Sequence, residues 1–72
     1  MSEAVLALIA ELAPLAADLA APLELASLEL VQLAEALEAR FDFVVLAREL
    51  GPENFGTAGR VIAFVARKRG MR

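Results

Sequence analysis

The sequence contains no cysteine, histidine, tryptophan or tyrosine. Without cysteine, the chain can form neither disulfide bonds nor thiolate metal sites. Without histidine, it lacks the commonest general base and the commonest metal ligand of proteins. No pair of acidic residues combines with a plausible pocket and a nucleophile. The sequence therefore favours a non-catalytic protein over an enzyme, and we expect no bound metal.

Long uncharged runs are also missing. No such run approaches the roughly 20 residues that cross a bilayer as a helix. The first residues, Met-Ser-Glu, lack the basic start of a secretory signal. We therefore expect a soluble, cytoplasmic protein that makes no contact with a membrane.

Alanine and leucine are the most abundant residues of the sequence. Hydrophobic residues make up 60% of the 72 positions, and most of them are these two strong helix formers. A chain of this length is one domain at most, covering residues 1–72. We predict a monomeric, all-α domain with the architecture of a small four-helix bundle.

The net charge of −3 is unevenly distributed along the chain. Residues 1–42 carry eight acids and one base, whereas residues 43–72 carry six bases and two acids. The acidic half would repel nucleic acid and attract a basic protein partner. The cluster Arg67-Lys68-Arg69 is typical of a helix C-terminus, where cations interact favourably with the helix dipole. We therefore predict no nucleic-acid binding.

Hydrophobic periodicity predicts three helices, over residues 3–13, 27–41 and 57–69. In each segment, apolar residues recur at the spacing that places them on one helical face. The positions expected on the buried faces are Val5, Leu8, Ile9, Leu12, Leu30, Leu33, Ala34, Leu37, Phe41, Val61, Ile62, Phe64 and Val65.

Local signals mark the ends of these helices. Ser2, Ser27 and Thr57 are expected N-caps, because a hydroxyl at that position accepts a hydrogen bond from the first turn. Pro14 is expected to end or kink the first helix. Gly70 is expected to end the last one.

Two segments lack a clear period. Residues 14–26 are expected to form a packed connector that holds a helical turn near residues 16–20. Residues 43–46 read as a strand by propensity, but a lone strand has no partner here, so we expect a buried loop. A short third helix is expected over residues 46–50, ending at Gly51. The side chains expected to reach the core from outside the long helices are Leu19, Leu23, Leu25, Phe43 and Phe55.

Residues 25–42, LASLELVQLAEALEARFD, resemble the attachment-site helix of acyl and peptidyl carrier proteins. That family carries Asp-Ser-Leu at the start of an acidic helix, followed by a Glu-rich turn and Phe-Asp. Residues 53–57, ENFGT, with the apolar residues 61–65, resemble the loop into the last helix of the family. The resemblance covers residues 23–66, whereas residues 3–13 fit as a generic first helix.

The resemblance implies a bundle of the acyl carrier protein type, with phosphopantetheine attached covalently to Ser27 as its cofactor. In the family, a phosphopantetheinyl transferase attaches this group, and its thiol then holds an acyl or aminoacyl cargo as a thioester. The implied partners are this transferase and acyl- or aminoacyl-transferring enzymes of fatty acid, polyketide or nonribosomal peptide biosynthesis. The spacing between Phe41 and Phe55 is closer to D-alanyl and other aminoacyl carrier proteins. The residues implied for partner docking are Leu28, Glu29, Val31, Glu35 and Glu38.

Ala26 stands where the family has aspartate. That aspartate helps recruit the transferase and its magnesium, so its absence leaves the efficiency of loading open. A first alternative is an interaction module of the same fold that is never modified and acts through its acidic second helix. A second is an unrelated helical bundle, against which stand the segment 54–57 and the irregular run 43–50.

Overall fold

Each of the three predicted hydrophobic stripes forms a helix. The computed structural model describes residues 1–12 and 19–70. All regular elements within these ranges are helices, and the described residues contain no β-strand. None of the helices in this part of the chain is long and apolar enough to cross a membrane. The elements are α1 (Ser2–Ala10), α2 (Ser27–Phe41), the short 3₁₀ helix η1 (Ala47–Glu49), α3 (Pro52–Phe55) and α4 (Ala58–Gly70).

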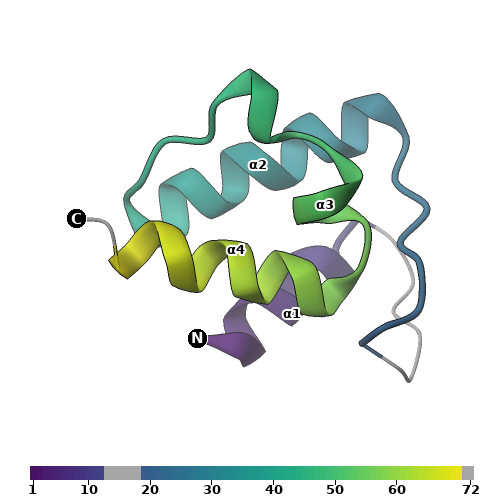
Figure 1. Ribbon diagram of the computed structural model, residues 1–72, viewed down its shortest axis with the longest axis horizontal. Coiled ribbons are helices and arrows are strands. Elements are labelled where there is room, and N and C mark those ends of the chain that lie inside the picture. Colours follow the sequence, from purple (N-terminus) through teal and green to yellow (C-terminus); the bar gives the residue numbers. More distant parts are fainter. Residues whose placement is uncertain (13–18, 71–72) are drawn as a thin grey trace.

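The three longer helices enclose one core (Figure 1). α1 packs against both α2 and α4, α2 also packs against α4, and the short α3 lies along α4. α2 and α4 run in the same direction across the view in Figure 1, so both end on the same side of the molecule. The described residues therefore form an all-α domain with four α-helices.

The core consists mainly of the predicted stripes, to which Phe55 and Ala58 are added. Its members are Val5, Ile9, Leu33, Leu37, Phe41, Phe55, Ala58, Val61, Phe64 and Val65. Ala34 is buried as well, and Leu8, Leu12, Leu30 and Ile62 pack against the core while partly buried. Among the described residues, none of the buried ones is polar or charged. The fold is therefore held by apolar packing, as the sequence predicts.

The helix boundaries differ from the prediction at both ends of α1 and at the end of α4. α1 ends at Ala10, and its N-cap is Met1 rather than Ser2, which lies in the first turn. Thr57 does cap α4, since its Oγ1 accepts the N–H of Arg60 at 3.1 Å. Gly70 is the last residue of α4 rather than a stop before its end. The predicted end of the first helix at Pro14 lies outside the described residues.

The connector before α2 packs across the start of α4. The N–H of Leu23 donates to the carbonyl of Gly56 at 2.8 Å, and the N–H of Gly59 donates to the carbonyl of Leu19 at 3.0 Å. A Cβ on residue 59 would lie 3.3 Å from that carbonyl oxygen, so glycine permits the close approach. Leu23 and Leu25 pack against the core as predicted.

Leu19 does not reach the core. Its side chain is 45% exposed, because the segment contacts α4 here through its backbone rather than through the leucine side chain. The expected helical turn near residues 16–20 falls largely outside the described residues.

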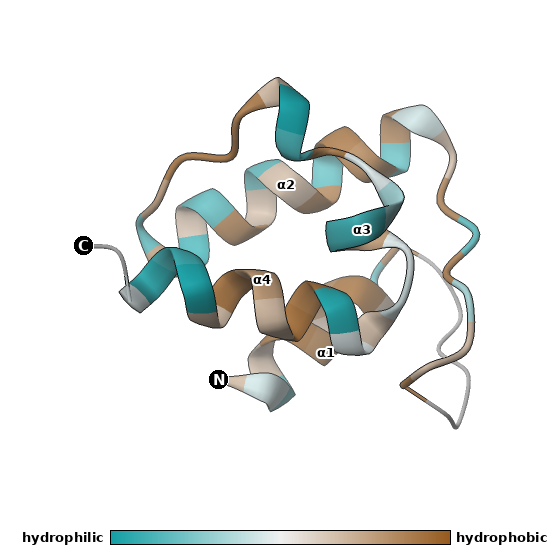
Figure 2. Ribbon diagram, viewed as in Figure 1, coloured by the Kyte–Doolittle hydropathy of each residue, from teal (hydrophilic) through white to brown (hydrophobic). Residues whose placement is uncertain are grey.

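The segment after α2 is only half buried, which corrects the prediction of a buried loop. Phe43 and Val45 pack against the core, whereas Val44 is 65% exposed and Leu46 is 38% exposed. Consecutive side chains point to opposite sides of an extended backbone, so a run of four apolar residues cannot bury all of them on one side. The brown stretch that follows α2 in Figure 2 is this run.

The third helix lies further along the chain than predicted. Residues 46–50 contain only the single 3₁₀ turn η1, and the short α-helix α3 begins after it at Pro52. Gly51 is the N-cap of α3 rather than the end of a helix. Proline is favoured at the first helical position, because its missing N–H has no partner there in any case. Pro52 was therefore a start signal that the prediction did not use.

The packing predicts a contrast between two leucines of α2. Leu37 is fully buried and Leu28 is 68% exposed. Leu37→Ala should lower the free energy of unfolding by about 2–5 kcal/mol, because it removes buried methyl groups and leaves a cavity. Leu28→Ala should change it by about 0.5 kcal/mol or less. Urea denaturation followed by circular dichroism measures both, and similar losses in the two variants would contradict this core.

Candidate functional site

Ser27 lies at the first position of α2 with its side chain exposed. The residue before it, Ala26, is the N-cap, with an extended backbone (φ −67°, ψ 160°). The prediction that Ser27 is the N-cap is therefore wrong by one residue. Because the hydroxyl of a first-turn residue is not in the cap position, Ser27 is not occupied in holding the helix start.

The start of α2 is capped from one direction only. Glu29 Oε1 accepts the N–H of Ala26 at 2.8 Å, which is the returning half of a capping box. The forward half needs a side-chain oxygen at residue 26, and alanine has none. α2 accordingly has no side-chain cap on its first N–H groups. These groups and the helix dipole remain available to an anion close to Ser27.

An exposed apolar and acidic face follows Ser27 along α2. Leu28 is 68% exposed, Val31 is 44% exposed, and Glu35 is exposed one turn further on. The buried stripe of α2 uses Leu33, Ala34, Leu37 and Phe41. Leu28 and Val31 therefore lie off that stripe, as the sequence analysis predicts, and they contribute little to the core.

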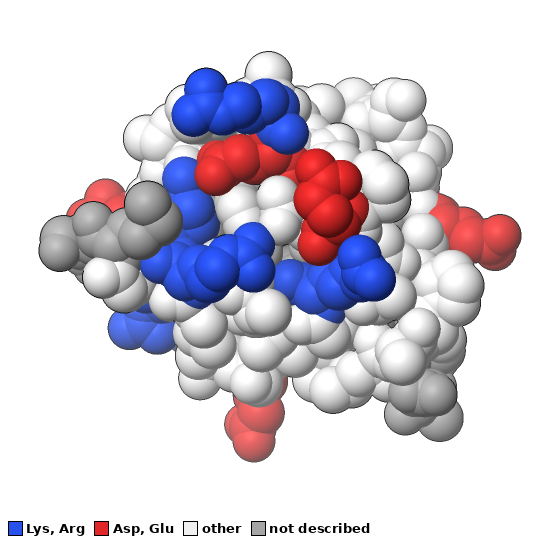
Figure 3. All heavy atoms as spheres, in the orientation of Figure 1, with Lys and Arg blue, Asp and Glu red and all other residues white. Residues whose placement is uncertain are grey.

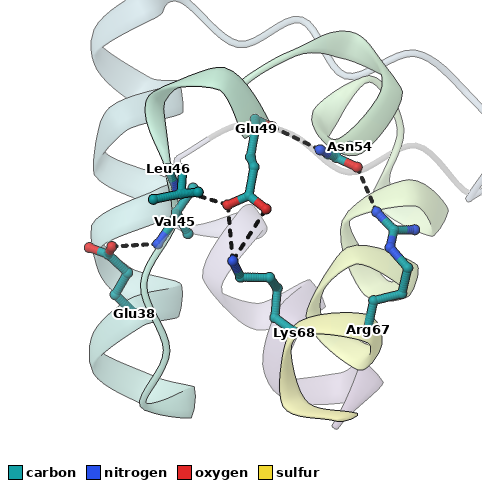
Figure 4. Close-up of polar contacts among 7 residues, drawn as sticks. All are labelled: Glu38, Val45, Leu46, Glu49, Asn54, Arg67 and Lys68. Carbon is teal, nitrogen blue, oxygen red and sulfur yellow. Dashed lines mark hydrogen bonds and ion pairs between the residues drawn. The ribbon is translucent and has the colours of Figure 1, made fainter. Parts of the chain in front are cut away.

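Glu29 and Glu38 have structural contacts that the sequence analysis did not foresee. Both are partly buried. Glu29 holds the N–H of Ala26, and Glu38 Oε2 accepts the N–H of Val45 at 2.7 Å (Figure 4). Reversing the charge of either residue would therefore disturb the fold as well as the surface. Glu35 is the one implied docking acid that is exposed rather than partly buried.

A set of polar side-chain contacts holds the segment between α2 and α4 in place (Figure 4). Glu49 forms an ion pair with Lys68 at 3.0 Å, and it also accepts the N–H of Leu46 at 2.8 Å. Asn54 donates from its side chain to the carbonyl of Glu49 at 3.0 Å and accepts from Arg67 at 2.7 Å. These contacts tie η1 and α3 to the last turns of α4.

The basic end of α4 is therefore more than a solubilising helix end. The helix dipole alone accounts for Arg67, Lys68 and Arg69 at the level of the sequence. In the structure, two of the three bind partners that are 13 and 19 residues away along the chain. Nothing in the local sequence pairs Lys68 with Glu49, so only the tertiary fold reveals this role.

An apolar hollow of about 180 Å³ lies near the start of α2. It is open to solvent on one side, and its walls come from the connector before α2, the first turn of α2 and the segment that contains α3. The side chains that form the walls are Leu23, Leu25, Leu30, Leu50, Pro52 and Phe55. The described residues contain no group of three or more acidic residues placed to hold a metal ion.

We expect the ion pair between Glu49 and Lys68 to be sensitive to acid. The backbone N–H of Leu46 and the ammonium of Lys68 stabilise the ionised carboxylate, so the pKa of Glu49 lies below its ordinary value of 4.5. A group with a lowered pKa stabilises the fold above its unfolded pKa, and this stabilisation is lost as the pH falls through the folded pKa. Unfolding free energies measured between pH 7 and pH 3 should therefore drop less for Glu49→Gln than for the wild type. Parallel pH curves for the two proteins would contradict the contact.

No family model, no curated protein and no solved structure matches this chain. The resemblance to carrier proteins thus rests on the motif residues of the chain itself.

Proposed function

We propose that this chain is a carrier protein that holds an acyl or aminoacyl group as a thioester on a phosphopantetheine arm at Ser27. The observation that carries the proposal is the combination of an exposed Ser27 at the first position of α2 with an exposed apolar and acidic face directly after it. The resemblance of residues 25–42 to the attachment helix of carrier proteins supports the same assignment.

The local geometry suits a phosphodiester on Ser27. The first N–H groups of α2 have no side-chain cap, because Ala26 supplies no oxygen. N–H groups at a helix start, together with the positive end of the dipole, are favourable neighbours for a phosphate. The cofactor would supply the thiol that a chain without cysteine lacks. Because Ser27 is exposed, it would present the thiol of the cofactor to several enzymes in turn.

Attachment requires help from the partner enzyme. The Ser27 oxygen bonds to the phosphorus that carries the pantetheine group of coenzyme A, the pyrophosphate linkage of coenzyme A breaks, and adenosine 3′,5′-bisphosphate leaves with the bridging oxygen. The hydroxyl proton of Ser27 must go to a base. The chain has no histidine, and the carboxylate nearest along α2, Glu29, is engaged by the N–H of Ala26. A base of the transferase would therefore take this proton, and the role of the chain is to present Ser27 in an accessible place.

Docking of partners falls on the exposed face of α2. Leu28 and Val31 offer apolar surface beside the attachment point, and Glu35 offers a negative charge. A partner with an apolar patch and basic residues around it would complement this face. Glu29 and Glu38 would contribute to its negative potential while they keep their backbone contacts.

One observation favours a second candidate function. Ala26 lacks the carboxylate that carrier proteins place before the serine. A chain that is never modified and acts only as an interaction module would use the same face of α2 without Ser27. Loading experiments separate the two candidates.

The first functional prediction concerns loading. A broad-specificity phosphopantetheinyl transferase with coenzyme A should add one phosphopantetheine to the wild type, seen as a mass increase of the intact chain. Ser27→Ala should abolish the increase. Ala26→Asp should speed loading, with about tenfold for each 1.4 kcal/mol of restored transition-state contact.

The same variant offers an internal control. Ala26→Asp should also raise the unfolding free energy by about 1 kcal/mol, because it supplies the missing N-cap oxygen. Ala26→Ser should give a similar stabilisation without the carboxylate. Faster loading of both variants would assign the effect to the helix start, whereas faster loading of Ala26→Asp alone would assign it to transferase recognition. Absence of loading in the wild type and in Ala26→Asp would favour the unmodified module.

The second functional prediction concerns docking. Glu35→Lys should weaken binding to the same transferase about threefold at low salt, because it reverses an exposed charge on the proposed face. The difference should shrink as salt is added. Glu3→Lys makes the same charge change at an exposed position of α1 and should leave binding unchanged. Equal effects of the two variants, measured by calorimetry, would assign the loss to net charge rather than to docking on α2.

A further inference from the structure

The end of the domain remote from Ser27 contains an open hollow of about 430 Å³. α2 and α4 both end there, beside the start of α1 (Figure 1). At 1.5 Å per residue, the 15-residue α2 places this hollow about 20 Å from Ser27. The residues that line it are Met1, Ala4, Arg40, Phe41, Asp42 and Arg69.

Two arginines from different helices line this hollow. The guanidinium carbon of Arg40 lies 5.5 Å from the centre of the Phe41 ring, and that of Arg69 lies 5.6 Å from the same centre. The two guanidinium carbons are therefore within about 11 Å of each other, since both are that close to one point. Phe41 is 9% exposed and belongs to the core, so it places both arginines against a fixed ring.

This pairing is not needed by the core. Each arginine alone is explained by its place in the last turn of a helix, where a cation is favourable. The dipole does not explain why the two charges converge on one ring beside an open hollow. Asp42 also lines the hollow, so the three charged side chains together carry a net positive charge. Convergent positive charge at a concave site favours an anion.

Because both cations are arginines, they restrict the chemical class of ligand that the hollow would bind. Arginine presents a planar fork of N–H donors that matches phosphate and carboxylate oxygens, and it keeps its charge at any physiological pH. The volume of the hollow falls within the range of small-molecule sites in proteins. Three of the six lining residues have charged side chains, which suits a polar ligand.

We propose that this hollow binds a small phosphorylated ligand, with Arg40 and Arg69 as the phosphate-binding residues. The proposal goes beyond the carrier function, because it uses neither Ser27 nor the exposed face of α2. It assigns the acidic protein a separate basic site at the other end of the domain.

Pyrophosphate is the probe for this site. We expect its titration, followed by amide chemical shifts at constant ionic strength, to give saturable changes confined to residues around the hollow. Arg40→Gln and Arg69→Gln should each weaken binding at least fivefold, and the double variant should remove saturation. Arg40→Lys keeps the charge but loses the fork, so it should bind with intermediate affinity. Arg60→Gln, an exposed arginine elsewhere on α4, should bind as the wild type does.

Several results would overturn the assignment. Absence of saturation in the wild type would show that there is no site. Equal weakening by Arg60→Gln would show attraction to net positive charge rather than to this hollow. Unchanged binding by both Arg40→Lys and Arg40→Gln would remove Arg40 from the site. Binding of citrate as tight as that of pyrophosphate would overturn the phosphate specificity.

Discussion

The packing around Phe64 is the interaction on which the rest of the structure depends. Its side chain is 1% exposed, and its ring contacts the rings of Phe43 at 6.2 Å and Phe55 at 5.2 Å between centroids. Phe43 in turn stacks on Phe41 at 6.4 Å. All four phenylalanines of the chain thus form one connected group that joins the end of α2, the segment after it, α3 and α4. In a domain this small, such a group is a large part of the core.

The position of the candidate site follows from this packing. Once Leu33, Leu37 and Phe41 face the core, the spacing of α2 turns Leu28 and Glu35 outward. The exposed face after Ser27 is thus the complement of the buried stripe. The connector across the start of α4 holds the N-terminal end of α2 in place through backbone hydrogen bonds. The site is therefore presented by a helix rather than by a loop.

The charged side chains of the domain both line its surface and link elements of the fold. Figure 3 shows one face on which basic side chains gather along α4 with acidic groups facing them from the adjacent segment. The ion pair of Glu49 with Lys68 and the hydrogen bond of Asn54 with Arg67 link these elements. Arg67 and Lys68 also lie within 6 Å of the ring of Phe64. The same basic cluster that balances the helix dipole thus covers the outer side of the aromatic core.

The sequence by itself determined the three long helices, nearly all of their buried residues, and the exposure of Leu28 and Val31. These depend on local periodicity, because one repeating spacing decides which side of a helix is apolar. Only the tertiary structure decided that Val44 faces solvent, that Ala26 rather than Ser27 occupies the N-cap position of α2, and that Lys68 pairs with Glu49. It also brought Arg40 and Arg69 to one ring. Contacts between residues that are distant in the chain, and a helix start that shifts by one position, depend on how the elements meet, and no local pattern encodes that.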